Sequence, residues 1–167
     1  MEATSNIILS QVQIQHKLRR MAYEIYEYND SEKEIILAGI WDRGYIIAEH
    51  LKKTLEEIAS FEVKLIRLDL DKVNPGEVKV SPETDFSGKV VVLVDDVANS
   101  GRTLLVAMKP LLQKLPRKIQ TAVLVDRMHK TFPVVADYIG YSLSTTLQDT
   151  IMVEMKGNEI VSAYLEG

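Results

Sequence analysis

Two adjacent acids, Asp95 and Asp96, lie between an apolar run and the start of a helix, where they could do chemistry. The run before them, Val90 to Val94, has the composition of a strand buried on both faces of a parallel sheet. Small or polar residues follow (98–101), and a helical pattern begins at Arg102-Thr103. A helix N-terminus binds phosphate through its unpaired N–H groups, and carboxylates before it suit sugar hydroxyls and hydrated Mg²⁺. The segment therefore predicts a sugar-phosphate site.

The spacing excludes two common phosphate motifs. Neither G-x-x-x-x-G-K-[ST] nor G-x-G-x-x-G occurs in this stretch. One alternative is a buried strand with an acidic end and Ser100 as an N-cap. Residues 90–103, VVVLVDDVANSGRT, resemble the phosphoribosyl-diphosphate (PRPP) signature of type I phosphoribosyltransferases, in which a hydrophobic strand, two acids and a short loop precede [ST]-G-[RK]-T.

Length and composition predict one globular domain over residues 1–167. The 167 residues are 46% hydrophobic, enough for a core, and the absence of cysteine excludes disulfides and thiolate metal sites. We find no signal peptide and no membrane span, so we expect a cytoplasmic protein that does not bind membranes. The net charge of −4 gives no overall attraction to nucleic acid.

Strand-like and helix-like segments alternate along the chain, which predicts an α/β fold with a parallel sheet and flanking helices. A helix capped by Ser10 is expected first, and a Gly157-Asn158 turn should join the last two strands. The expected strands are 34–40, 62–70, 90–94, 119–125, 137–143, 151–155 and 159–164, and the other helices are 45–58 and 103–115. Pro110 should kink or end the last of these helices.

Three polar loops follow strands of this sheet, at residues 41–44, 95–103 and 126–129. Ligands bind such sheets beyond the carboxyl ends of the strands, so we expect these loops to form one site. With Ala136-Asp137-Tyr138-Ile139-Gly140 added, the chain resembles the bifunctional pyrimidine-operon regulators that are also uracil phosphoribosyltransferases. That resemblance runs from about Ile14 to the C-terminus.

The resemblance implies that uracil and PRPP react to give UMP and diphosphate, with Mg²⁺ as cofactor. Asp95 and Asp96 would be the catalytic residues, holding the ribose hydroxyls and facing the positive charge that develops on the ribose. They would also hold Mg²⁺ through water. The 5′-phosphate would be bound by the loop Val97, Ala98, Asn99, Ser100, Gly101, Arg102 and Thr103.

The same resemblance assigns the diphosphate to Asp42, Arg43 and Gly44. The chain departs from the family pattern Lys-Thr-Arg-Gly, because Trp41 and Asp42 occupy its first two places. A lost lysine and an added acid should weaken anion binding. Alternatively, Asp42 could bind Mg²⁺ on the diphosphate.

For the nucleobase, the resemblance assigns Arg127 to an exocyclic oxygen, Tyr138 to the ring face and the backbone of Ile139 to the base edge. Tyr138 could instead be an aromatic residue of the core. Asn99 stands where purine-salvage members carry an aspartate, and an amide cannot act as a general base. This favours uracil, with hypoxanthine or guanine transfer as the alternative.

The resemblance implies that the polar segment 71–88 is a mobile hood that closes over PRPP and excludes water. A homodimer or a higher homo-oligomer is also expected from the resemblance. RNA is a possible further partner, because Arg20 and His129 match positions of the regulators' RNA-binding face. Tyr23 and Tyr141 replace basic residues there, so we favour a solvated helix face over an RNA site.

Overall fold

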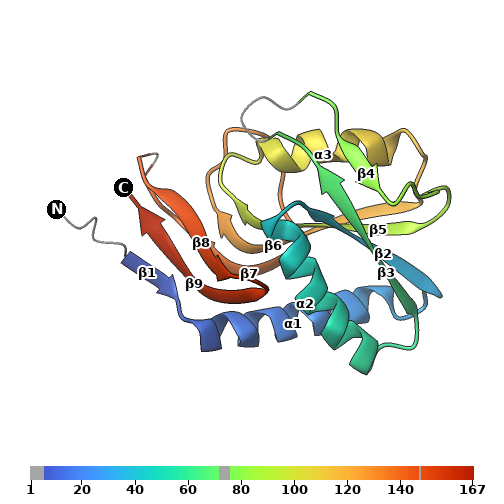
Figure 1. The fold of residues 1–167 in the computed structure, drawn as a ribbon, viewed down its shortest axis with the longest axis horizontal. Helices are drawn as coiled ribbons and strands as arrows, with labels where there is room; N and C mark the ends of the chain where they lie inside the picture. Colours follow the sequence, from blue (N-terminus) through green and yellow to red (C-terminus); the bar gives the residue numbers. More distant parts are fainter. Residues whose placement is uncertain (1–5, 72–75, 147) are drawn as a thin grey trace.

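The computed structural model describes residues 6–71, 76–146 and 148–167 (Figure 1). Its larger sheet has six strands in the order β4-β3-β2-β5-β6-β7, all parallel except β4 at one edge. The strands are β2 (Glu34–Ile40), β3 (Glu62–Asp69), β4 (Lys79–Ser81), β5 (Val90–Ala98), β6 (Lys118–Arg127) and β7 (Tyr138–Leu143). The predicted α/β fold with a parallel sheet is confirmed.

The central strand β5 is longer than the sequence predicts. Its pairing with β6 continues past Val94 to the register partners Ala98 and Asp126. Both Asp95 and Asp96 therefore lie inside the strand rather than in a loop after it. Their position in the sheet fixes the backbone of both acids on a rigid element.

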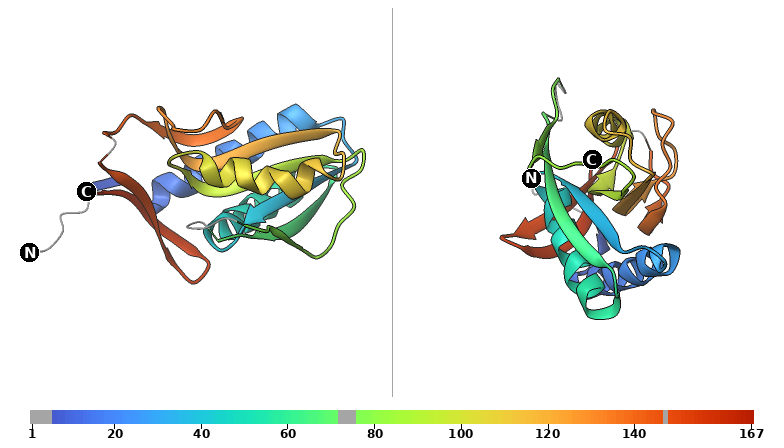
Figure 2. Two further views of the ribbon diagram at one scale, coloured as in Figure 1. Left: turned by 90° about the horizontal axis from the view of Figure 1, so that it is seen from above. Right: turned by 90° about the vertical axis from the view of Figure 1, so that its right-hand side faces the viewer.

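Helices cover both faces of this sheet. The helices α1 (Gln11–Asn29) and α2 (Arg43–Ile58) pack on one face, and α3 (Arg102–Leu112) packs on the other (Figures 1 and 2). Ser10 caps α1 as predicted: its hydroxyl accepts from the Gln13 N–H at 3.3 Å, and the Gln13 side chain accepts from the Ser10 N–H at 2.9 Å. Pro110 lies in the last turn of α3, which ends at Leu112 rather than Leu115. None of the three helices in the described residues has the length and apolar run that a membrane crossing needs.

A second, antiparallel sheet has the strand order β1-β9-β8, with β1 (Asn6–Leu9), β8 (Thr150–Lys156) and β9 (Glu159–Glu166). The predicted turn at residues 157–158 joins β8 to β9, whereas β1 was not predicted. Apolar residues of this sheet, including Ile151 and Val153, extend the core beneath α1 and α2. Figure 1 shows this sheet at one end of the larger one, where β8 approaches β5.

The hood predicted at 71–88 is described only in part, because residues 72–75 lie outside the described residues. The rest is not simply a polar loop. Strand β4 pairs antiparallel with β3, and Phe86 is fully buried against the α3 face of the sheet. The segment is therefore anchored to the sheet on both sides of Pro82.

Candidate active site

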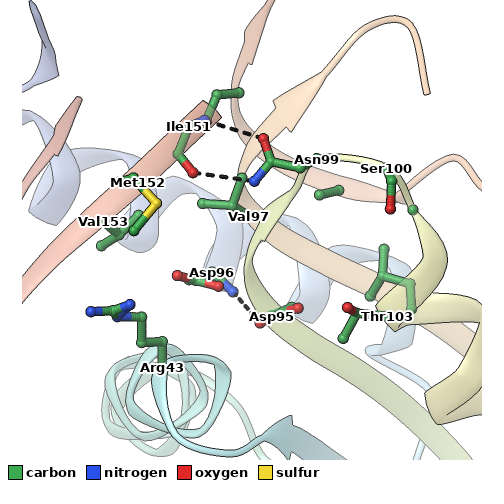
Figure 3. Close-up of a pocket in the computed structure, with 13 residues that line it drawn as sticks. Arg43, Asp95, Asp96, Val97, Asn99, Ser100, Thr103, Ile151, Met152 and Val153 are labelled. Carbon is green, nitrogen blue, oxygen red and sulfur yellow. Dashed lines mark hydrogen bonds between the residues drawn. The ribbon is translucent and has the colours of Figure 1, made fainter. Parts of the chain in front are cut away.

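A cavity of about 240 Å³ opens at the carboxyl end of β5. It joins residues from the start of α2, from β5, from the loop before α3 and from β8 (Figure 3). Its lining consists of Arg43, Asp95, Asp96, Val97, Ala98, Asn99, Ser100, Gly101, Thr103, Leu104, Ile151, Met152 and Val153. Nine of these thirteen residues were predicted from the sequence.

The two acids of β5 are the most buried charged groups of the cavity. Asp95 is 1% exposed and Asp96 is 6% exposed. The Asp95 carboxylate accepts a hydrogen bond from the Asp96 N–H at 2.8 Å, which orients it toward the end of the strand. Figure 3 shows Arg43 entering from α2 on the side of the cavity opposite Thr103, so the acids lie between a cation and the loop before α3.

The loop before α3 depends on Gly101. This residue adopts φ +85°, and a Cβ there would lie 2.6 Å from Val134 Cγ1. The Ser100 carbonyl accepts from the Phe132 N–H at 3.0 Å, and the Ser100 hydroxyl accepts from the Arg102 N–H at 3.2 Å. The loop is thus packed against residues 132–134 and fixed at the N-terminus of α3, where phosphate binding is favourable.

The loop between β2 and α2 approaches β5 closely at Gly44. A Cβ on this residue would lie 2.5 Å from the Val94 carbonyl oxygen and 2.9 Å from Asp95 Cα. Arg43 is the first residue of α2 and lines the cavity, whereas Asp42 occupies the N-cap without a side-chain capping bond. The Trp41–Asp42 peptide is cis.

Asn99 connects the loop before α3 to the second sheet. Its Nδ2 donates to the Ile151 carbonyl and its Oδ1 accepts from the Ile151 N–H, both at 3.2 Å. Arg127 donates to Asn99 Oδ1 at 3.2 Å and to the Asp149 carbonyl. Arg127 therefore holds the Asn99 side chain through this bond and does not itself line the cavity.

The structure does not bring Tyr138 and Ile139 to the cavity. Tyr138 lies at the first residue of β7, and the carboxyl end of that strand at Leu143 is about 16 Å further along. Its hydroxyl donates to Gln120 at 2.8 Å and accepts from Asn29 at 3.3 Å, and burial raises its pKa to about 12. Tyr138 is thus an aromatic residue of the core, and its placement over a base is corrected.

Three further predicted residues differ from their expected positions. Asp42, Gly44 and Arg102 lie next to lining residues but do not line the cavity themselves, and the Arg102 residue is exposed. In place of β7, the strand β8 closes the cavity with Ile151, Met152 and Val153. The sequence predicted a strand here, but its alternating pattern gives no indication that it belongs to a second sheet facing β5.

The donor set fits a magnesium ion that retains most of its water. Within residues 6–71, 76–146 and 148–167, no group of three His, Cys, Asp or Glu side chains could hold a metal. The cavity instead offers two adjacent carboxylates, Asp95 and Asp96. Mg²⁺ commonly binds through one or two carboxylates together with water and substrate phosphates.

Comparisons with known proteins agree with this geometry. The phosphoribosyl transferase domain family matches residues 5–155. The Bifunctional protein PyrR of Fusobacterium nucleatum subsp. nucleatum is 37% identical over 166 residues, 93% of this chain and 94% of that protein. That of Bacillus pumilus is 36% identical over 173 residues, 95% of this chain and 96% of that protein.

Solved structures show the same fold. The hypoxanthine phosphoribosyltransferase of Trypanosoma cruzi superposes with a TM-score of 0.81 at 15% identity, covering 99% of this chain and 100% of that one. A hypoxanthine-guanine phosphoribosyltransferase of Bacillus anthracis gives 0.75 at 19% identity, covering 95% and 96%. The chain therefore belongs to the phosphoribosyl transferase domain family and, within it, to the family of the bifunctional PyrR proteins.

Proposed function

We propose that this protein transfers the phosphoribosyl group of PRPP to uracil, releasing diphosphate and UMP. One observation carries the proposal: a single cavity joins the Asp95-Asp96 pair, the loop 97–103 at the N-terminus of α3, and Arg43. The loop suits a phosphate, the acids suit a ribose and Arg43 suits a second anion, and the acids lie between the other two as the ribose does in PRPP. The site residues and their roles below are part of this proposal.

In this reaction the bond from ribose C1 to the diphosphate oxygen breaks. A bond from C1 to the base nitrogen forms as that nitrogen loses its proton. Positive charge develops on the ribose while negative charge develops on the leaving diphosphate. Arg43 would bind the diphosphate, and the carboxylates of Asp95 and Asp96 would hold the ribose hydroxyls and stabilise the cation electrostatically.

The 5′-phosphate would be bound by backbone N–H groups at the start of α3 and by the hydroxyls of Ser100 and Thr103. Their rigid placement against residues 132–134 fixes the ribose relative to the two acids. Mg²⁺, when bound, would neutralise charge on the diphosphate, with Asp95 and Asp96 holding it through water.

The choice of uracil is supported by the relatives named Bifunctional protein PyrR and by Asn99. An amide at this position cannot accept a proton from a purine nitrogen, and its donor and acceptor already bind Ile151. Hypoxanthine or guanine transfer is the alternative. The structural neighbours that use purines share the fold at less than 25% identity.

An RNA-binding, attenuation-regulating role is a second candidate, because the relatives are named as bifunctional proteins. Arg20, one of the residues that suggested RNA binding, makes contacts within the protein instead. Its guanidinium pairs with Glu24 and donates to the carbonyls of Ile139 and Gly140 at 3.1 and 2.7 Å. Phosphate contacts would show as an RNA affinity that falls steeply with salt.

The transfer proposal is tested by comparing wild type with Asp96→Asn in an assay of UMP formation from uracil, PRPP and Mg²⁺. Removing the charge of Asp96 should lower kcat about a hundredfold. The matched control is Asp30→Asn, the same chemical change on the exposed end of α1, which should leave kcat unchanged. Equal turnover by Asp96→Asn and wild type would remove the proposed role of this carboxylate.

A further inference from the structure

The tryptophan at position 41, the only one in the sequence, lies on a neighbouring cation. The guanidinium carbon of Arg67 is 3.6 Å from the centre of the Trp41 ring. The same guanidinium is held at its edge by Asp69: Nε donates to the two carboxylate oxygens at 3.0 and 2.9 Å, and Nη2 lies 2.9 Å from Oδ1. One face of the cation is thus covered by an indole while a carboxylate fixes its plane.

This stack joins β3 to the loop that carries Arg43. Arg67 belongs to β3 and is the register partner of Gly39 in β2. The Trp41 N–H also donates to the Leu68 carbonyl at 2.8 Å. Asp42, the next residue, makes no side-chain capping bond, so side-chain anchoring of this part of the loop comes from Trp41.

The other end of the loop is anchored on β5. Gly44 lies so close to Val94 and Asp95 that a Cβ there would clash with their backbone. Arg43 stands between the two anchors and lines the cavity. The position of its guanidinium therefore depends on where Trp41 is held.

We propose that the Trp41–Arg67 stack, fixed by Asp69, holds the loop 41–44 in the shape that binds the diphosphate group of PRPP. Trp41 and Arg67 are positioning residues in this proposal, which rests on the proposed transfer reaction. Trp41 is 42% exposed and the Arg67 side chain is 38% exposed. Exposed groups of this kind contribute little to the stability of a core, so substitutions here should leave the protein folded.

The kinetic test uses Arg67→Met, Arg67→Lys and Trp41→Leu. Each should raise KM for PRPP about tenfold and leave KM for the base and kcat within about twofold, because the stack acts on the diphosphate loop alone. Arg67→Lys keeps the charge but not the flat guanidinium, so it should resemble Arg67→Met. Because Trp41 also contacts the Tyr45 ring in α2, the double variant Trp41→Leu/Arg67→Met should bind PRPP about as weakly as Trp41→Leu alone, since both variants remove the stack.

Arg117→Met is the matched control, because Arg117 also pairs with an acid, Glu32, on the surface at the opposite end of the strands. It should leave KM for PRPP unchanged. Trp41→Phe should recover part of the affinity that Trp41→Leu loses. An unchanged KM for PRPP in both Arg67 variants would overturn the proposal while leaving the transfer reaction intact.

A binding measurement separates the two proposals. Inorganic diphosphate with Mg²⁺ should change the fluorescence of Trp41 in wild type, and calorimetry should show about tenfold weaker diphosphate binding in Arg67→Met. If these changes occur but no base is turned over, the stack holds an anion-binding loop and the proposed transfer function fails. Diphosphate affinity equal in wild type and Arg67→Met would contradict the stack's role.

Discussion

The Asn99 side chain forms two hydrogen bonds with the Ile151 backbone: its carboxamide donates to the Ile151 carbonyl and accepts from the Ile151 N–H, each at 3.2 Å (Figure 3). This pair joins two parts of the cavity that are 52 residues apart in the sequence. One part is the loop that suits the 5′-phosphate, and the other is strand β8, which closes the cavity. Together with the core packing of Ile151 and Val153, this pair holds the two sides of the cavity in place.

Asn99→Leu should widen and loosen the cavity at this point. Leucine is similar in size but leaves the Ile151 N–H and carbonyl without their partner, at a cost of about 1–3 kcal/mol in the free energy of unfolding. We expect KM for the base to rise more than KM for PRPP. Urea denaturation and steady-state kinetics check this, with Asn158→Ala, an exposed change in the β8–β9 turn, as the control. Unchanged stability and base KM would contradict the bridging role.

Gly101→Ala should impair PRPP binding. The residue has φ +85°, and the added Cβ would meet Val134 Cγ1 at 2.6 Å, so the loop must shift. The backbone strain alone is about 1 kcal/mol. KM for PRPP should rise at least tenfold, since the loop is displaced at the N-terminus of α3. Gly76→Ala, where a Cβ meets nothing within 4 Å, is the control and should match wild type.

Lys130→Met should destabilise the protein strongly. The Lys130 ammonium lies 2.8 Å from Asp126 and donates to the Arg127 carbonyl at 2.9 Å, and the two charged side chains are only 6% and 7% exposed. Removing one partner leaves a buried carboxylate uncompensated, which costs about 3–5 kcal/mol. Chemical denaturation measures this loss. Adding Asp126→Asn to Lys130→Met should recover part of the stability, and a further loss of similar size would show that the pair is not coupled.

Tyr138→Phe should affect stability and leave base binding unchanged. Deleting the hydroxyl removes hydrogen bonds with Gln120 and Asn29 and costs about 1 kcal/mol at pH 7. A base KM that rises tenfold would restore Tyr138 to the base site.

The free energy of unfolding at alkaline pH gives an independent check on the burial of Tyr138. Burial raises the pKa of Tyr138 from 10.0 to about 12, so the folded state keeps a proton that the unfolded state loses above pH 10. Its contribution is present in full below pH 10 and declines by about 1.4 kcal/mol per pH unit until pH 12. Between pH 10 and 12, the stability of Tyr138→Phe should therefore fall less steeply than that of wild type.

The sequence predicted what depends on local pattern. The apolar run Val90 to Val94 correctly predicted a buried strand, and Ser10 and Gly157 marked a helix start and a turn. The acids that follow this run lie inside the strand rather than in a loop after it. The resemblance assigned Tyr138 to the base, whereas the structure places it in the core at the start of β7, as the alternative interpretation predicted. Which end of a strand faces a ligand depends on sheet register, here Ala122 opposite Tyr138 and Arg127 opposite Leu143.

The hairpin of the second sheet was predicted, but strand β1 and the position of this sheet beside β5 were not, for a related cause. Residues 6–9 pair with β9 across most of the chain length, whereas β8 pairs with β9 as a local hairpin. Strand β8 is held at the cavity by the packing of Ile151 and Val153 in the core and by the contacts of Asn99 and Arg127 with residues 149–151. No periodicity within β8 indicates this. The stack of Trp41 on Arg67 is equally hard to predict from the sequence, because 25 residues, including helix α2, lie between the two side chains.

The most direct test of the central claim is a panel of free bases, each supplied with PRPP and Mg²⁺, with nucleotide and diphosphate products quantified. We expect UMP and an equal amount of diphosphate from uracil, and a far lower rate with guanine or hypoxanthine. Nucleotide formed from guanine or hypoxanthine but not from uracil would contradict the assignment of the base. No nucleotide from any base would contradict the proposed reaction itself.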